Sequence, residues 1–340
     1  MKVTLHIGTE KTGTTSIQKA LDRDREALAA RGILYPRLFG SSNHMEIAVA
    51  AMDPDSRDEL QMIELGRQAC SHIEYVARLK RRIREEREGG TFRHLLISNE
   101  HCHSRLRDRE AISRIADLLD VPVENFEVVV YLRRQDRLAV SLHSTRLKLG
   151  GQGSVFPPIN PRALPHYFDF FRLLSLYSQV FGAHRLRVRL YERARLEGGD
   201  VVTDFYELAS LGLVPSTLPR ENASLSRRQV LFLERFNRVF PMIRDGNLNK
   251  ERGPIFAAIR KAGLGEPFLP RRDDALAFYD HFRAGNAAVR ADYFPDLDRE
   301  TLFDEDFSDY PTDPHDSGLT EDDLMEFVSS IWRFNRSGRG

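Results

Sequence analysis

The fold prediction rests on the stretch Leu5-His6-Ile7-Gly8-Thr9-Glu10-Lys11-Thr12-Gly13-Thr14-Thr15-Ser16. A short apolar run ends in a turn bounded by two glycines, and a helical pattern follows it. The glycines let the backbone curl with its N–H groups pointing inward, and a helix N-terminus adds partial positive charge and unpaired donors. Lys11 supplies a full positive charge. The stretch therefore predicts an anion-binding loop between a strand and a helix.

Short apolar runs alternate with longer helical patterns along the first half of the chain. Strands are predicted at residues 2–7, 33–35, 94–98, 127–132 and 185–190. Helices are predicted at residues 14–31, 58–87, 109–119 and 136–149. This alternation predicts an α/β fold with a mostly parallel central sheet, flanking helices, and ligands bound at the carboxyl ends of the strands.

Beyond residue 190 the pattern stays helical. The helical stretches are residues 201–211, 226–240, 255–262, 273–293 and 320–335. The economical division is an α/β core over residues 1–225, which holds the ligand-binding motifs, and a helical C-terminal extension over 226–340 packed on that core.

Composition limits the classes of partner. The chain has 340 residues, with 50 Lys and Arg against 50 Asp and Glu, so its net charge gives no reason to expect a nucleic-acid partner. Cys70 and Cys102 form no disulfide or metal framework, which favours a reducing compartment. No apolar run approaches the roughly 20 residues of a membrane span, and no signal-peptide core follows Met1. These features predict a cytoplasmic protein without a membrane span.

The loop differs from that of nucleotide hydrolases. Their phosphate loop reads G-x-x-x-x-G-K-[ST]; here the gap between Gly8 and Gly13 is kept, but Thr14 follows Gly13 and the lysine stands at position 11. Those enzymes also need an acidic residue at a second strand tip to hold magnesium, whereas residues 128–132 are followed by Arg133. The pattern favours anion binding without a metal.

Lys11-Thr12-Gly13-Thr14-Thr15 resembles the 5′-phosphosulfate loop of sulfotransferases, whose core is Lys-[Ser/Thr]-Gly-Thr-Thr after a strand. The resemblance is to bacterial, carbohydrate-sulfotransferase-like enzymes. It implies 3′-phosphoadenosine 5′-phosphosulfate (PAPS) as donor cosubstrate and a sheet fold related to P-loop nucleotide kinases. The family's second signature is an arginine after a strand and a serine eight residues later, matched by Arg133 and Ser141. The pair after the arginine departs from the family, being Arg134-Gln135 instead of an Asn-Pro-like pair.

The resemblance implies roles for particular residues. Lys11 would contact the bridging oxygen of the donor, and the 5′-phosphate would be held by the loop. The 3′-phosphate would be held by Arg133 and Ser141. The predicted donor-binding residues are Lys11, Thr12, Gly13, Thr14, Thr15, Ser16, Arg133 and Ser141.

Sulfuryl transfer also needs a base for the acceptor hydroxyl and an aligned acceptor. Candidate bases are Glu100 and His44, ranked together, with His101 behind them. The expected acceptor is a saccharide or glycolipid. Two alternatives stay open: a nucleotide-dependent phosphotransferase, and a non-catalytic phosphonucleotide-binding module.

Overall fold

The computed structural model describes residues 1–40, 42–160, 162, 164–216, 224–244, 247–249, 251–262, 265–313 and 318–337. Its contacts divide the chain into two compact units. The first comprises Met1–Arg134, Arg162–Pro219 and Arg283–Phe303, and the second Gln135–Pro161, Arg220–Phe282 and Asp304–Gly340. This division differs from the predicted single boundary at residue 225. Residues 135–161, which precede that boundary, belong to the second unit, and residues 283–303, which follow it, belong to the first.

A five-stranded parallel sheet forms the centre of the first unit, in the order β2-β3-β1-β4-β5. The strands are β1 Lys2–His6, β2 Ile33–Leu34, β3 His94–Ser98, β4 Phe126–Leu132 and β5 Leu186–Leu190. The central strand β1 pairs with β3 on one side and β4 on the other, so that Leu5 lies beside both Ile97 and Val128. The predicted α/β class with a parallel central sheet is confirmed.

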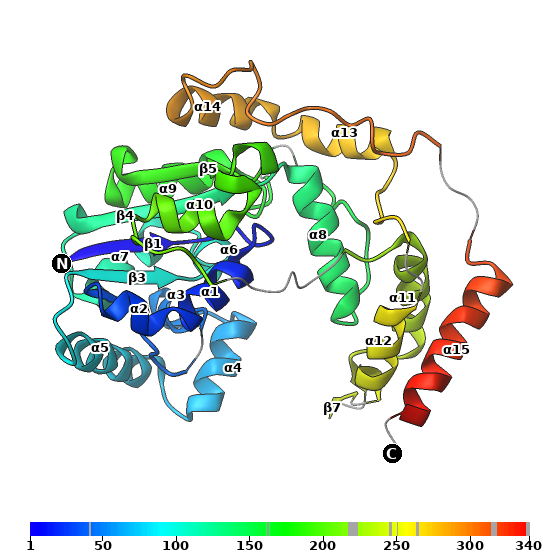
Figure 1. Cartoon of the computed structure of the whole chain (residues 1–340), viewed down its shortest axis with the longest axis horizontal. Coiled ribbons are helices and arrows are strands. Elements are labelled where there is room, and N and C mark those ends of the chain that lie inside the picture. Colours follow the sequence, from blue (N-terminus) through cyan, green and yellow to red (C-terminus); the bar gives the residue numbers. More distant parts are fainter. Residues whose placement is uncertain are drawn as a thin grey trace. The chain divides into compact units, whose positions relative to one another are not determined.

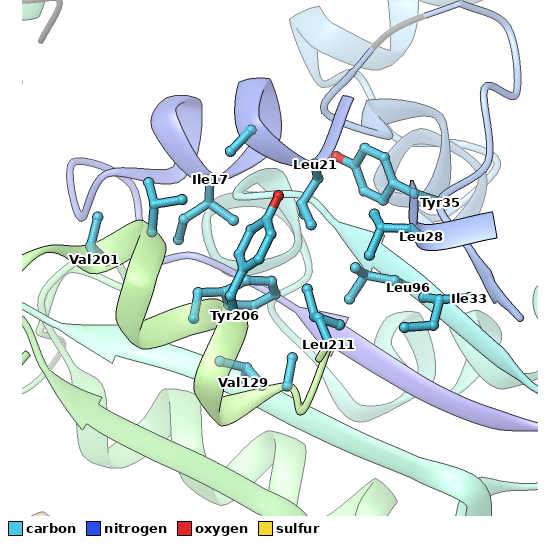
Figure 2. Close-up of a cluster of buried hydrophobic side chains, with 14 of the residues drawn as sticks. Ile17, Leu21, Leu28, Ile33, Tyr35, Leu96, Val129, Val201, Tyr206 and Leu211 are labelled. Carbon is cyan, nitrogen blue, oxygen red and sulfur yellow. The ribbon is translucent and has the colours of Figure 1, made fainter. Parts of the chain in front are cut away.

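One face of this sheet is covered by α1 Thr14–Arg23, α2 Arg25–Ala29 and α10 Val201–Leu208. Figure 2 shows their apolar side chains in one buried cluster with those of the strands, which includes Ile17, Tyr206 and Val129. A second layer consists of α3 Met45–Ala51, α4 Glu59–Gln68, α5 His72–Glu88, α7 Arg109–Leu119 and α9 Phe170–Phe181. In this layer α7 contacts α3, α5 and α9, and α9 contacts β4, β5 and α14 Arg283–Tyr293.

Three predicted helices are each two helices in the structure. The stretch 14–31 is interrupted at Asp24, whose buried carboxylate accepts a hydrogen bond from the Tyr206 hydroxyl at 2.8 Å. The stretch 58–87 is interrupted where Ala69 adopts a positive φ and Ser71 caps the next helix. The stretch 273–293 consists of α13 Arg272–Asp280 and α14, which belong to different units. Capping residues and side-chain hydrogen bonds can end a helix without changing the spacing of its apolar residues. The hydrophobic pattern of the sequence therefore does not reveal these helix ends.

The described part of the second unit is mainly helical (Figure 1). Its helices are α8 Gln135–Lys148, α11 Arg227–Val239, α12 Arg252–Lys261, α13 and α15 Glu321–Ser337, with a short hairpin of β6 Ile243–Arg244 and β7 Asn247–Leu248. Helix α8 contacts α11 and α13, and α12 contacts α15. Its buried apolar cluster includes Leu147, Leu233, Phe236 and Phe327.

The remaining elements are short. They are α6 His101–Arg105 and four 3₁₀ turns at Val123–Asn125, Ala183–Arg185, Arg193–Arg195 and Glu197–Gly199. Among the described residues, no helix combines the length and apolarity that crossing a membrane requires.

Candidate functional site

The loop between β1 and α1 has a backbone that only particular residues fit. Gly8 and Gly13 have φ values of +90° and +81°, in the left-handed region. A Cβ atom on Gly13 would lie 2.6 Å from Cγ1 of Val201, and one on Gly8 would lie 3.0 Å from Cβ of Glu100. Both glycines are therefore needed for conformation and for space. Lys11 also has a positive φ, of 66°.

Threonine side chains fix this loop to its neighbours. The buried Thr12 hydroxyl donates to the carbonyl of Thr9 at 2.6 Å, and the Thr9 hydroxyl donates to the carbonyl of Tyr131 at 3.0 Å. The Thr12 hydroxyl thus stabilises the turn by a buried hydrogen bond within it. Thr14 is 5 % exposed, whereas Thr15 and Ser16 are exposed.

The turn leads directly into the first turn of α1. The opening N–H groups of a helix have no partner within it and suit an anion. Thr14 and Thr15 supply such groups, whereas the Ser16 N–H already donates to the Gly13 carbonyl at 2.9 Å. The backbone at Thr14 and Thr15 is therefore the better placed part of the predicted donor-binding set.

The two strands beside β1 bring a cation and a carboxylate to the loop. Arg133 follows β4, and its Nη1 donates to the carbonyl of Lys11 at 2.9 Å. Its guanidinium carbon lies 5.7 Å from the centre of the Tyr191 ring. Glu100 follows β3, and Nε2 of the buried Gln18 donates to its Oε2 at 2.7 Å. The structure thus brings Lys11, Glu100 and Arg133 together at the carboxyl edge of the sheet.

Opposing charges act on the Lys11 ammonium group. Burial lowers its pKa, and the neighbouring Arg133 lowers it further. Glu10 and Glu100 act in the opposite direction, raising the pKa of Lys11 by favouring its charged form. Glu10 is itself held, because the Tyr167 hydroxyl donates to its Oε1 at 2.9 Å. The Lys11 ammonium thus lies among one guanidinium and two carboxylates, and the formal charges of these four side chains sum to zero.

His44 is placed as a structural residue. Its ring is fully buried, its Nε2 donates to the carbonyl of Pro36 at 2.7 Å, and the backbone N–H of Ser98 donates to its Nδ1 at 3.2 Å. Burial lowers the pKa of His44 to about 3. Both ring nitrogens of the neutral imidazole are in use, so taking a proton from an acceptor would break the bond from Ser98. This geometry speaks against His44 as the base.

The other two candidate bases lie where β3 ends. Glu100 is half-buried, as is His101, the first residue of α6. The backbone N–H of His101 donates to Oδ1 of Asn99, whereas its Nδ1 is buried without a hydrogen-bond partner. Glu100 acts electrostatically on Lys11 from the end of β3, as Glu10 does from within the loop.

Ser141 lies on α8 in the second unit, whereas Arg133 belongs to the first unit, whose first segment ends at Arg134. The carbonyl of Ser141 accepts a hydrogen bond from the Thr145 hydroxyl at 3.2 Å. Its pairing with Arg133 at a 3′-phosphate stays a prediction from spacing.

Comparisons with known proteins identify no family. No protein-family model matches the chain, and no solved structure matches it significantly. It is similar to an uncharacterised protein of Archaeoglobus fulgidus, with 26% identity over 188 residues, which cover 54% of this chain. The matched region covers 50% of that relative, so the chain spans about half of its length. Among the described residues, no cluster of three or more His, Cys, Asp or Glu side chains could hold a metal ion.

Four residues at the site had no role in the sequence analysis: Glu10, Gln18, Tyr167 and Tyr191. Gln18 faces inward on α1 and orients Glu100. Tyr167 reaches Glu10 across 157 positions of sequence. No local pattern marks such a contact, although Gln18 could have been noticed as a polar residue on the apolar face of an amphipathic helix.

Proposed function

We propose that this protein is a PAPS-dependent sulfotransferase with a P-loop-related fold, which transfers a sulfuryl group to a hydroxyl of a saccharide or glycolipid. The observation that carries the proposal is the position of Lys11. It lies in a glycine-bounded turn between the central strand and α1, flanked by Glu100 and Arg133 at the carboxyl ends of the neighbouring strands. Open parallel sheets bind ligands at this edge.

The donor would be held by the loop of the first unit. Backbone N–H groups of Gly13, Thr14 and Thr15 suit the 5′-phosphate, and the Lys11 ammonium suits the oxygen that bridges phosphorus and sulfur. Arg133 supports this arrangement in a second way, because it holds the Lys11 carbonyl and so the loop conformation. A guanidinium can also bind a phosphate through a charge-assisted fork.

The proposed transfer is a single displacement. The acceptor oxygen attacks sulfur, and the bond between sulfur and the bridging oxygen breaks, with its electron pair left on the departing phosphate. The acceptor proton passes to the Glu100 carboxylate, which Gln18 orients. The Lys11 ammonium stabilises the charge that develops on the leaving oxygen. Positioning and charge stabilisation dominate related phosphoryl transfers as well.

A nucleotide-dependent phosphotransferase is the main rival. It would need a lysine after Gly13 and an acidic residue after a second strand to hold magnesium. Thr14 follows Gly13, and Arg133 follows β4. Both positions favour sulfuryl transfer over magnesium-dependent phosphoryl transfer.

Binding of the product nucleotide tests the proposal directly. We expect adenosine 3′,5′-bisphosphate to raise the Tm of the protein, since a ligand at a hundredfold excess over its Kd stabilises by about 2.7 kcal/mol. Differential scanning fluorimetry with ATP, with and without magnesium, is the control. Stabilisation by ATP and magnesium alone would support the phosphotransferase. Bisphosphate binding without transfer of labelled sulfate to saccharides, phenols or cell-envelope extracts would support the non-catalytic module.

Replacing Glu100 tests the choice of base. Glu100→Gln retains an oxygen that can accept from Gln18, so we expect normal folding and bisphosphate binding, with kcat reduced about 10²- to 10⁴-fold. Glu110→Gln, an exposed change on α7, should be indistinguishable from the unmodified protein. Full activity of Glu100→Gln together with loss in His101→Gln would move the role to His101.

A further inference from the structure

Helix α15 of the second unit carries apolar side chains on two different faces. Its inner face packs within the unit, where it contacts α12 (Figure 1). The Phe327 ring is fully buried, with its centre 4.4 Å from that of Phe232. The Ser330 hydroxyl donates to the carbonyl of Ala258 at 2.9 Å. These contacts fix the rotation of α15 about its own axis, and with it the side chains that face outward.

The outer face of α15 exposes a row of large apolar side chains. Met325 is 60 % exposed, Val328 54 % and Trp332 65 %. Their spacing of three and four residues places them one above the other on the surface of a helix. An isolated exposed apolar side chain is normal in a protein, whereas a continuous row of them indicates a surface that another molecule covers. We call these three residues the outer row.

Charges of opposite sign lie beside the two ends of the outer row. Asp322 is exposed in the first turn of α15, and Arg333 is exposed eleven positions later. Since each residue turns the helix by about 100°, both side chains lie on the same side of the row. They are separated by roughly 16 Å along the helix axis, which is too far for an ion pair within one helix.

A second α15 in the antiparallel direction matches this pattern. When a two-fold axis passes between positions 328 and 329, Met325 and Trp332 are equally far from it, so each lies opposite the other residue of the second helix. Val328 then lies beside the axis, at the centre of the contact. The same register places Arg333 of each helix within about 3 Å, along the axis, of the level of Asp322 in the other. The row and its flanking charges are therefore complementary to themselves.

We propose that the outer row of α15 is a dimerisation surface, on which α15 of a second copy of this chain packs antiparallel. Met325 contacts the partner's Trp332, and Arg333 pairs with the partner's Asp322. A two-fold interface joins the same patch of both subunits, which is the condition that this pattern meets. Antiparallel packing also places the two helix dipoles in the favourable orientation. The inference is independent of the proposed function.

An anionic membrane surface fits the outer row less well. Helices that lie on such membranes are rich in Lys and Arg on their polar side. Residues 321–337 instead contain four carboxylates and two arginines. Charge thus favours a second copy over a lipid surface. Because the row is short, we expect a weak dimer.

The dependence of association on concentration tests the proposal. Sedimentation equilibrium of the full chain should show monomers at about 1 µM and dimers at about 500 µM, as expected for a small interface. Trp332 is the only tryptophan of the chain, so its fluorescence emission should move to shorter wavelength over the same range. Val328→Lys brings two ammonium groups together at the axis and should keep the protein monomeric. Val239→Lys, which replaces a 71 % exposed valine on α11, is the matched control and should dimerise normally.

Charge exchange tests the antiparallel register. Asp322→Arg alone and Arg333→Asp alone each place like charges opposite one another, and each should raise the Kd of the dimer about tenfold. An equimolar mixture of these two variants regains both ion pairs, as does the double variant, and both should associate like the unmodified protein. Since the two positions are too distant to pair within one helix, recovery requires contact between copies.

Each other outcome counts against the proposal. A protein that stays monomeric at every concentration overturns it, and so does a dimer that Val328→Lys leaves intact. A monomeric protein whose Trp332 emission shifts on adding phosphatidylglycerol vesicles would assign the outer row to a lipid surface instead. If Val328→Lys does not fold, the charge variants decide, because both of their positions are exposed. A mixture that associates no better than the single variants overturns the antiparallel pairing.

Discussion

Replacing Lys11 by methionine should reduce sulfuryl transfer about 10³-fold or more while leaving the protein folded. Methionine keeps the aliphatic part of the side chain and removes the ammonium group that is proposed to stabilise the leaving oxygen. Removing a single neutral donor from such a position already costs enzymes about 10²- to 10³-fold in kcat. Transfer of labelled sulfate at saturating donor measures the effect.

The control for this variant is Lys19→Met, which removes an exposed lysine from α1, the helix that follows the loop. It should transfer at the normal rate. Both variants should unfold at the same urea concentration as the unmodified protein. A Lys11→Met protein that transfers sulfate normally would contradict the assignment of Lys11, and one that fails to fold would show that the ammonium supports the loop instead.

A steep loss of stability between about pH 6 and pH 4 is the second large effect that we expect. His6, His44 and His103 are fully buried, and burial lowers the pKa of each to about 3. His94 is 8 % exposed, and its pKa is lowered to about 4. Their ordinary pKa is about 6.5. All four are therefore neutral in the folded protein over a range in which the unfolded chain binds protons.

The direction follows from proton linkage. Well above pH 6.5, their ordinary pKa, neither state protonates these histidines, and their contribution to stability is complete. As the pH falls towards 4, the unfolded chain takes up protons that the folded chain does not, so the free energy of unfolding decreases. Each histidine contributes about 1.4 kcal/mol per pH unit, and four give roughly 5 kcal/mol per unit. A domain in the lower half of the ordinary stability range, about 5–15 kcal/mol, should unfold near pH 5.

Urea denaturation at several pH values measures this slope. His44→Gln should reduce it by about one proton, or about 1.4 kcal/mol per pH unit, whereas His184→Gln, an exposed change, should leave it unaltered. A stability that is flat between pH 6 and pH 4 would show that these rings are reached by solvent.

The sheet was predictable because its signals are local. Alternating apolar runs marked all five strands, and the glycines at positions 8 and 13 marked the turn after the first. Helix boundaries were less predictable, because Asp24 and Ser71 end or start helices through single hydrogen bonds that the apolar period does not record. Helices α3, α6 and α9 lie outside the predicted helical ranges.

The candidate site was predictable in part. Lys11, Glu100 and Arg133 could be expected together, since each follows a strand and parallel strands present their carboxyl ends at one edge. The burial and hydrogen bonding of the His44 ring could not be expected, because they depend on Pro36 and on Ser98, which is 54 positions away in sequence. The hydrogen bond from Tyr167 to Glu10 could not be expected either, because the two residues are 157 positions apart.

By itself the sequence determined the parallel α/β architecture and the position of a lysine-bearing loop after the central strand, because hydrophobic period and turn chemistry act within a few residues. Only the tertiary structure decided which polar groups are buried, neutral or held by a neighbour. In it, His44 hydrogen-bonds to main-chain groups, Arg133 donates to the Lys11 carbonyl, and Tyr167 donates to Glu10. The physical reason is that burial and pairing depend on residues that become neighbours only after the strands have assembled.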